Sequence, residues 1–238
     1  MKVWRAIIVV LAGFCGAGCG LSNDQGLEIY SDYYDFNEGL DGWTVDFADY
    51  PSGDQDSASY ELQFAHTSLP GNLSGRKGIM MSGYNYSDDL FMFMKKKVTG
   101  LPPNKLFTIV FQIELASNAP TGAIGVGGAP GESVYVKAGA STMEPKKVVE
   151  QDQYVLNIDK GNQLESGEDV ITLGNIAVSP NTTEYELITR SNMNMNALFY
   201  AQTNSKGELW LIVGTDSGFE GLTTVYYTQL NFVFSATN

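Results

Sequence analysis

The segment that decides the fold is Leu106-Phe-Thr-Ile-Val-Phe-Gln-Ile-Glu-Leu115, along which apolar side chains recur at every second position. Successive side chains of a β-strand point to opposite faces, so alternate residues of this segment share a face. One face is wholly apolar and consists of Phe107, Ile109, Phe111, Ile113 and Leu115. The other face carries polar residues such as Thr108, Gln112 and Glu114. This pattern predicts a strand whose apolar face lies in a hydrophobic core.

Similar alternation and enrichment in β-branched and aromatic residues recur along residues 30–234. The other strands that we expect are Ser57–Ala65, Gly78–Gly83, Leu90–Val98, Ser133–Lys137, Glu184–Arg190, Glu208–Val213 and Thr224–Phe234. No segment has a convincing helical period, and Met143–Gln153 is expected to form at most a turn or two of helix after Pro145. Long connections rich in Gly, Asn and Ser separate the strands. The sequence therefore predicts an all-β fold, an antiparallel β-sandwich in one domain that spans residues 30–238.

The composition excludes several classes of function. The chain has 238 residues, with 14 Lys and Arg against 27 Asp and Glu, which gives a formal net charge of −13. Phosphate binding needs clustered cations, so no nucleic-acid partner is expected. The single basic cluster, Lys95-Lys96-Lys97, is expected at an edge strand or a solvated strand end. One His and two Cys exclude most histidine-based catalysis and a zinc site made only of His and Cys.

The N-terminus has the anatomy of an export signal. Lys2 and Arg5 precede the short apolar run Ala6–Phe14, which is too short to span about 30 Å of hydrocarbon comfortably. Small residues and Cys19 follow this run. The segment Gly16-Ala17-Gly18-Cys19 resembles a bacterial lipobox, although Gly16 stands where that family usually has Leu.

The lipobox resemblance implies a lipoprotein. It implies removal of residues 1–18 as a signal peptide, acylation of Cys19 with lipid chains such as palmitate, and anchoring to a lipid bilayer. Residues 19–29 then form a polar tether, with no Asp directly after Cys19. In bacteria with two membranes, lack of that Asp implies sorting to the outer membrane, so we expect a lipid-anchored protein of the bacterial cell envelope. Loss of Lys2 and Arg5 leaves 12 cations against 27 anions and changes the net charge from −13 to −15. The ordinary secretory signal remains the alternative.

The start of the domain resembles another family. In Asp35-Phe-Asn-Glu-Gly-Leu-Asp-Gly-Trp43, the residues Phe36, Glu38, Gly39, Gly42 and Trp43 match the opening of many jelly-roll carbohydrate-binding modules. Leu222–Phe234 looks like the closing strand of the same architecture. The resemblance implies a jelly-roll-like sandwich. Trp43 is expected in the core, because Gly42-Trp43 opens a strand. In the family, the closing strand usually carries an acidic pair that helps to hold a structural calcium ion, whereas this chain has Thr228-Gln229. We expect no cofactor, with structural calcium as the open alternative.

Sugar binding uses aromatic faces together with polar side chains. The segment Gly83-Tyr-Asn-Tyr-Ser-Asp-Asp89 places two tyrosines, an amide and two carboxylates on one turn. Tyr84, Asn85 and Tyr86 are therefore the first candidate ligand residues. The alternative is a hairpin tip whose tyrosines lean on neighbouring side chains. Further candidate stacking faces are Tyr50, Trp210, Tyr226 and Tyr227.

Two other segments contain groups that bear chemistry. Gly214-Thr-Asp-Ser-Gly-Phe-Glu-Gly221 carries Asp216 and Glu220, which suit ligand binding or an acid/base pair. The alternative is a tight loop in which Asp216 and Ser217 bond to the backbone.

The segment from Asn157 to Glu168 faintly resembles a calcium-binding loop. Asn157, Asp159 and Glu168 offer oxygen ligands, but Gly161 and Asn162 occupy the fifth and sixth positions, where a ligand and a glycine are needed. These three residues are the candidate metal ligands.

Three functions remain open at this point. The leading hypothesis is a membrane-anchored lipoprotein whose sandwich binds an extracellular or periplasmic ligand, most plausibly a glycan. The first alternative is a structural or adhesive envelope protein without a small ligand. The last is a hydrolase that depends on carboxylates such as Asp216.

Overall fold

The computed structural model describes residues 28–53, 58–195 and 198–237. The expected signal peptide, Cys19 and most of the expected tether lie outside the described residues. The first strand begins at Ile29, at the end of the expected tether. Among the described residues, no helix is both long and apolar enough to cross a membrane.

The described residues are almost entirely strands and their connections. One short 3₁₀ helix, η1, covers Gly71–Leu73. The strands are β1 (Ile29–Asp35), β2 (Thr44–Ala48), β3 (Tyr50–Pro51), β4 (Gln63–Ser68), β5 (Lys77–Tyr84), β6 (Leu90–Val98), β7 (Leu106–Ser117), β8 (Val134–Ser141), β9 (Lys147–Glu150), β10 (Gln153–Leu156), β11 (Val170–Asn175), β12 (Glu186–Ser191), β13 (Phe199–Gln202), β14 (Leu209–Ser217) and β15 (Leu222–Ala236).

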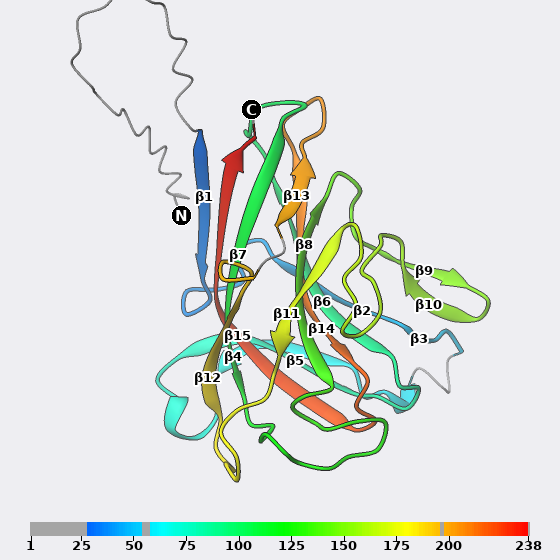
Figure 1. Cartoon of the computed structure of the whole chain (residues 1–238). Coiled ribbons are helices and arrows are strands. Elements are labelled where there is room, and N and C mark those ends of the chain that lie inside the picture. The colour runs from blue at the N-terminus through cyan, green and yellow to red at the C-terminus, as the bar shows by residue number, and fades with distance from the viewer. Residues whose placement is uncertain (1–27, 54–57, 196–197, 238) are drawn as a thin grey trace, which may run out of the picture.

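Two antiparallel sheets form a jelly-roll-like β-sandwich (Figure 1). The first sheet has the order β12-β7-β15-β5-β4, with β1 paired to β15 and β13 paired to β7. The second sheet has the order β11-β8-β14-β6-β2. A small third sheet, β3-β10-β9, projects from the side of the sandwich (Figure 1). The all-β antiparallel sandwich expected from the sequence is confirmed.

The core lies between the two large sheets, and the alternation in β7 places side chains there. All five apolar residues on the inner face of β7 are fully buried: Phe107, Ile109, Phe111, Ile113 and Leu115. Trp43 is also in the core, where it stacks on Phe232 with ring centroids 5.9 Å apart and meets the edge of Tyr34. The core position expected for Trp43 is therefore confirmed.

The outer face of the second sheet has its own cover. A second group of buried apolar residues, including Phe91, Phe93 and Ile212, lies on this face. The segment that follows β10 packs over it, with Ile158 buried and Leu156 partly buried. Residues that point away from the main core on β8 and β14 therefore also lie in a desolvated environment.

The edge of β7 is completed by an amide side chain. On the side of β7 that faces away from β15, β12 and β13 pair with different parts of the strand. Between them, this side of the β7 backbone has no strand partner. The buried Asn192 fills this gap. Its Oδ1 accepts a hydrogen bond from the Phe111 N–H at 2.8 Å, and its Nδ2 donates to the Ile109 carbonyl at 3.0 Å. Asn192 thus imitates a strand residue and satisfies two buried backbone groups.

The expected helix in Met143–Gln153 is wrong. The structure has instead the hairpin of β9 and β10, joined by Gln151 and Asp152. Both joining residues have positive φ angles, 48° and 63°, which suits a tight two-residue hairpin turn. Val148 and Val149 favour the extended conformation, and pairing with β3 outweighs the weak helical signal of Pro145.

Two other expectations need correction. The strand expected at Ser57–Ala65 begins only at Gln63, because residues 58–59 are helical and a turn follows. Of the two placements expected for the lysine cluster, the edge strand is wrong, because β6 lies between β14 and β2. The strand end is confirmed, because the lysines lie at the C-terminal end of β6 and Lys97 is exposed. The lysines are partnered by carboxylates: Lys95 by Glu144, Lys96 by Asp41 and Lys97 by Glu208.

Candidate functional site

A row of tyrosines runs from the β5–β6 loop to the small third sheet. Tyr84 and Tyr86 are stacked, with ring centroids 4.4 Å apart and an angle of 24° between the ring planes. The edge of Tyr60 contacts Tyr86 at 5.7 Å, and Tyr50 lies between Tyr60 and Tyr154 at 5.5 and 5.0 Å. Tyr60 and Tyr50 are buried, whereas 54% of Tyr86 is exposed. Tyr86 is thus the exposed member of this row, held between the rings of Tyr84 and Tyr60.

Asn85 supports this row from below. Only 1% of Asn85 is exposed, and its Nδ2 donates to the carbonyls of Ser217 at 2.8 Å and Phe219 at 3.1 Å. Its Oδ1 accepts from the Ser87 N–H. The turn uses both polar atoms of the Asn85 side chain, and the sequence hypothesis that Asn85 contacts a ligand stays a prediction. Its neighbours Tyr84 and Tyr86 stay candidates.

A polar pocket of about 290 Å³ is lined by residues that are close in sequence to members of the tyrosine row. Its lining includes Asp49, Asp89, Asp159, Lys160 and Asn162. The chain brings the two features together through short steps in sequence. Asp49 immediately precedes Tyr50, the β5–β6 loop carries both Tyr86 and Asp89, and Tyr154 is next to a pocket residue of β10. We call this combination of tyrosine row and pocket the candidate site.

The floor of the pocket is a cluster of five charged side chains, of which four are buried and Asp89 is 43% exposed. Lys160 Nζ lies 2.8 Å from Asp216 Oδ2, 3.0 Å from Asp49 Oδ2 and 3.8 Å from Asp89 Oδ1. Lys137 Nζ lies 3.3 Å from Asp216 Oδ2, and both of these side chains are fully buried. We call these residues, Lys137, Lys160, Asp49, Asp89 and Asp216, the charged cluster.

Lys137 also fastens the segment that covers the cluster. It projects from the outer face of β8 and donates hydrogen bonds to the carbonyls of Lys160 and Glu165, both at 2.8 Å. Asp216 Oδ2 accepts a further bond from the Gln163 N–H at 3.0 Å. The charged cluster thus joins the second sheet, the covering segment and the β5–β6 loop.

Burial shifts the pKa values of the cluster in ways that its ion pairs partly offset. Burial raises the pKa of Asp49, and Lys160 partly offsets this rise. The pKa of Asp89 is raised to about 7. Burial is the largest cause, Lys160 opposes it, and the Asp49 and Asp216 carboxylates act in the same direction as burial. Burial lowers the pKa of Lys137, and Asp216 partly opposes that change. For Lys160, burial lowers the pKa, but the three carboxylates outweigh burial and raise it above the usual lysine value.

The structure corrects the hypothesis for Asp216 and places Glu220. Asp216 is not on an exposed loop but on β14, where it is fully buried between two lysines. Glu220 is partly exposed in the turn after β14. Glu220 and Asp88 of the β5–β6 loop both lie close to Gly127, because a Cβ atom placed on Gly127 would be 2.9 Å from Glu220 Cγ and 3.2 Å from Asp88 Oδ1. Asp216 and Glu220 therefore do not form an exposed acid/base pair.

Three of the four other candidate stacking faces are covered, and the fourth, Tyr226, is partly exposed and meets Tyr185 edge to face. Tyr227 is fully buried and only 4% of Tyr50 is exposed. Trp210 has the ammonium groups of Lys95 and Lys97 over its ring, at 5.8 and 5.4 Å from the centroid.

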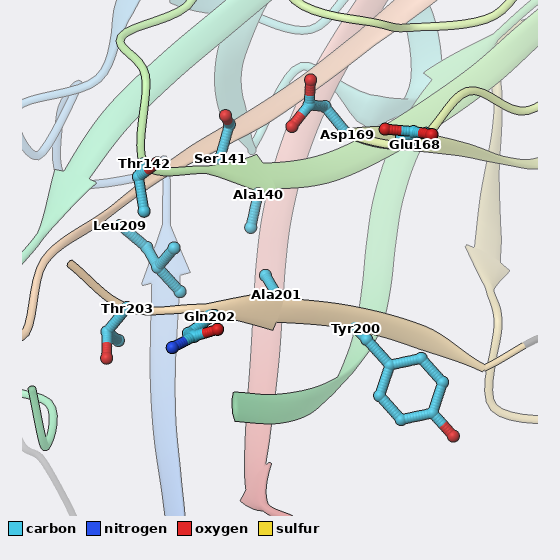
Figure 2. Close-up of a pocket in the computed structure, with 10 residues that line it drawn as sticks. All are labelled: Ala140, Ser141, Thr142, Glu168, Asp169, Tyr200, Ala201, Gln202, Thr203 and Leu209. Atoms are coloured by element: carbon cyan, nitrogen blue, oxygen red, sulfur yellow. The ribbon is translucent and has the colours of Figure 1, made fainter. Parts of the chain in front are cut away.

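A second hollow, of about 450 Å³, opens between β8 and β13 (Figure 2). Ala140 and Ala201 point toward each other across it, while the ring of Tyr200 points away (Figure 2). Asp169 and Ser141 lie on the opposite side of β8 from β13 (Figure 2). Since its polar groups diverge, this hollow is less suited to hold a ligand than the candidate site.

The side chains of two of the three candidate metal ligands, Asn157 and Asp159, are engaged in local hydrogen bonds. Asp159 accepts hydrogen bonds from the N–H groups of Gly161 at 3.0 Å and Glu168 at 2.8 Å, and these bonds lower its pKa. Asn157 bonds to the backbone of Lys146 and Glu144. Within the described parts of the chain, no group of three or more His, Cys, Asp or Glu side chains is arranged to hold a metal ion.

The closing strand uses protein groups where the resemblance implies a calcium site. Thr228 lies at a register shift of β15, and its hydroxyl donates to Glu114 Oε1 at 2.8 Å. The same carboxylate oxygen pairs with Arg76 at 2.6 Å. The sequence hypothesis of a structural calcium ion stays a prediction.

Comparison with known proteins gives structural likeness only. The sequence matches no family model, and no curated protein matches it. One similar solved structure is a carbohydrate-binding module from the β-sandwich superfamily, with 12% identity, a TM-score of 0.39, and coverage of 85% of this chain and 72% of that one. A second is a CBM22-1 xylan-binding domain from Paenibacillus barcinonensis, with 10% identity, a TM-score of 0.38, and coverage of 87% of this chain and 94% of that one.

A third similar structure holds two modules of a Clostridium thermocellum xylanase, CBM22-1 and GH10, complexed with xylohexaose. The match has 12% identity and a TM-score of 0.39, and it covers 87% of this chain and 28% of that one. All three TM-scores are 0.39 or lower and all identities are 12% or lower, so the likeness extends to the type of sandwich and no further.

Proposed function

We propose that this chain is a membrane-anchored protein of the bacterial cell envelope whose β-sandwich binds carbohydrate at the candidate site. The observation that carries this proposal is the stacked pair of Tyr84 and Tyr86, of which Tyr86 is 54% exposed on the loop that also carries Asp89 of the polar pocket. The C–H face of a sugar ring packs well on an aromatic face, and its hydroxyl groups bond to carboxylates and amides. The pocket supplies such acceptors in Asp89, Asp159 and Asn162.

The charge of the chain supports a neutral or cationic glycan. The chain without residues 1–18 carries a net charge of −15, since loss of Lys2 and Arg5 lowers the full-chain value of −13 by two. Three carboxylates line the pocket, and Lys160, the one cation among its lining residues, is turned into the charged cluster. Like charges at short range are unfavourable, so uronate and sulfate sugars are disfavoured.

Replacing Tyr86 with alanine tests the proposal. We expect the wild-type protein to bind neutral or amino-sugar polysaccharides on a glycan array, and Tyr86→Ala to weaken that binding by about five- to tenfold, because a lost stacking face is worth about 1–1.5 kcal/mol. Tyr200→Ala is the matched control, since Tyr200 is 47% exposed but lies on β13 at the other hollow. An array on which Tyr86→Ala and the wild type bind equally would contradict the proposal.

The membrane anchor has a separate test. Cys19 is proposed as the acylated residue, and the acidic domain itself is expected to be repelled by anionic lipid head groups. We expect Cys19→Ser to shift the protein from the membrane fraction to the supernatant and to remove the lipid mass found by mass spectrometry. An unchanged mass and unchanged partitioning would refute acylation of Cys19 and leave the carbohydrate proposal standing.

A further inference from the structure

We propose that Asp89 and Asp216 share a proton in the folded protein, and that this proton holds the β5–β6 loop, and with it Tyr86, against the sandwich. The loop comprises residues 85–89 and joins β5 to β6. This inference concerns the regulation of the candidate site, and its consequence for binding rests on the proposed function.

The charges of the cluster do not balance when all five groups are ionised. Two lysines face three aspartates, so the fully ionised cluster carries a formal charge of −1. Four of the five side chains are removed from water, because those of Lys137 and Asp216 are fully buried and those of Lys160 and Asp49 are each 8% exposed. The Asp89 side chain is 43% exposed, but its Oδ1, which faces Lys160, is buried. An unbalanced charge in such an environment is costly, and one proton removes it.

One carboxylate oxygen of Asp89 and one of Asp216 lack a hydrogen-bond donor. Asp89 Oδ1 and Asp216 Oδ1 are both buried and have no hydrogen-bond donor. Both carboxylates lie against the same ammonium group, since Lys160 Nζ is 3.8 Å from Asp89 Oδ1 and 2.8 Å from Asp216 Oδ2. If both were ionised, two buried acceptors would face one another without a donor. One shared proton satisfies both oxygens.

Asp89 is the carboxylate that holds this proton most strongly. Asp216 has Lys160 at 2.8 Å and Lys137 at 3.3 Å, and Asp49 has Lys160 at 3.0 Å. The ammonium group nearest to Asp89 is at 3.8 Å. Asp89 is therefore the least compensated of the three, so it is the group that accepts a proton first.

The charged groups around Asp89 come from every element packed on it. Lys160 lies on the covering segment, Asp49 between β2 and β3, Lys137 on β8 and Asp216 on β14. Asp159 lines the same pocket. Within the loop and the turn beside it, Asp88 and Glu220 add further negative charge. Burial and the Asp49 and Asp216 carboxylates together raise the pKa of Asp89 to about 7, against the opposing effect of Lys160.

The loop that carries Tyr86 is fastened at both ends. At its first end, Asn85 bonds to Ser217 and Phe219. At its second end, Gln163 Nε2 donates to the Asp88 carbonyl at 2.8 Å, while the Gln163 N–H donates to Asp216. Loss of the shared proton makes Asp89 and Asp216 repel each other, so it loosens only the second end. Tyr86 is then less firmly held beneath a ligand.

The proton can be observed directly by carbon NMR of the aspartate carboxyl groups. We expect the Asp89 carboxyl to titrate near pH 7 in the wild-type protein, and amide hydrogen exchange of the loop to accelerate above that pH. Asp89→Asn cannot titrate, but its side-chain amide still donates toward Asp216, so loop exchange should lose this added pH dependence. Asp88→Asn is the matched control, because Asp88 is exposed and adjacent, and should keep the wild-type profile.

Stability provides a second readout. The unfolded chain releases the Asp89 proton near pH 4, whereas the folded protein releases it at about 7. Between these values the folded state binds more protons, so the free energy of unfolding falls as the pH rises through this window and then levels off. We expect Asp89→Asn to reduce this fall and Asp88→Asn to retain it.

The outcomes separate this inference from the proposed function. Titration of Asp89 near pH 4, or loop exchange with the same pH dependence in Asp89→Asn as in the wild type, would overturn the shared proton whether or not a glycan binds. Titration near pH 7 with faster loop exchange above it supports the shared proton even on a blank glycan array. Where a glycan binds, its affinity should fall severalfold from about pH 6 to about pH 8 in the wild type and not in Asp89→Asn; equal falls in both proteins would count against the loop mechanism.

Discussion

Replacing Asp216 with alanine is expected to lower the free energy of unfolding by about 3–5 kcal/mol, because it removes one partner of a buried ion pair. The ammonium groups of Lys137 and Lys160 lie 3.3 and 2.8 Å from this carboxylate. Without Asp216, the fully buried Lys137 keeps only two carbonyl acceptors. The covering segment also loses the bond from the Gln163 N–H.

Denaturation with urea, followed by circular dichroism, measures this effect. Glu38→Ala is a suitable control, because Glu38 is an exposed carboxylate and its removal should change stability by about 0.5 kcal/mol or less. Asp216→Asn retains an oxygen acceptor for Lys160 and Gln163 and should lose less than Asp216→Ala. A loss below about 1 kcal/mol for Asp216→Ala would show that the charged cluster does not hold the covering segment in place.

Replacing Trp43 with alanine is expected to cost a similar amount, about 3–5 kcal/mol, for a different reason. Only 2% of Trp43 is exposed, and its ring stacks on Phe232 and meets the edge of Tyr34. Alanine would leave a large cavity between the two sheets, which the rigid strands around it would fill only partly.

Trp210→Ala is the matched control for the Trp43 substitution. Trp210 is partly exposed on the outer face of β14, with Lys95 and Lys97 over its ring. Its removal should cost about 1 kcal/mol, mainly through lost cation–π and surface contacts. Equal losses for the two tryptophans in thermal or chemical denaturation would contradict the packing described for the core.

The sequence predicts the long strands well and the short ones poorly. In β7 the alternation runs over the whole strand, so the inner face can be assigned residue by residue. The strands missed from the sequence include β1, whose alternation is interrupted by Ser31 and Asp32, and β9, which has only four residues. Short segments of this kind become strands because a partner is present, and pairing partners are not encoded in a local pattern.

The candidate site could be predicted only in part for a related reason. Tyr84 and Tyr86 lie close together in sequence, so their turn can be recognised. Asp49, Asp89 and Lys160 are far apart in sequence and meet only after the sandwich has formed.

The alternation along β14 predicts which face of the sheet carries Asp216, but not that Asp216 is buried. Val213 and its alternate neighbours on β14 point to the main core, so Asp216 must point to the outer face of the second sheet. That outer face is usually open to water in an antiparallel sandwich. Here the segment after β10 covers it, and no feature of β14 itself reveals this cover.

Carbohydrate is proposed to bind at the exposed ring of Tyr86, and titration of the tyrosine ring signals by NMR tests this binding site most directly. With a polysaccharide that the glycan array identifies, we predict that the ring signals of Tyr84 and Tyr86 shift with increasing ligand, while those of Tyr200 and the exposed Tyr33 remain in place. Shifts centred on Tyr200, or a bound polysaccharide that leaves Tyr84 and Tyr86 unchanged, would contradict the account.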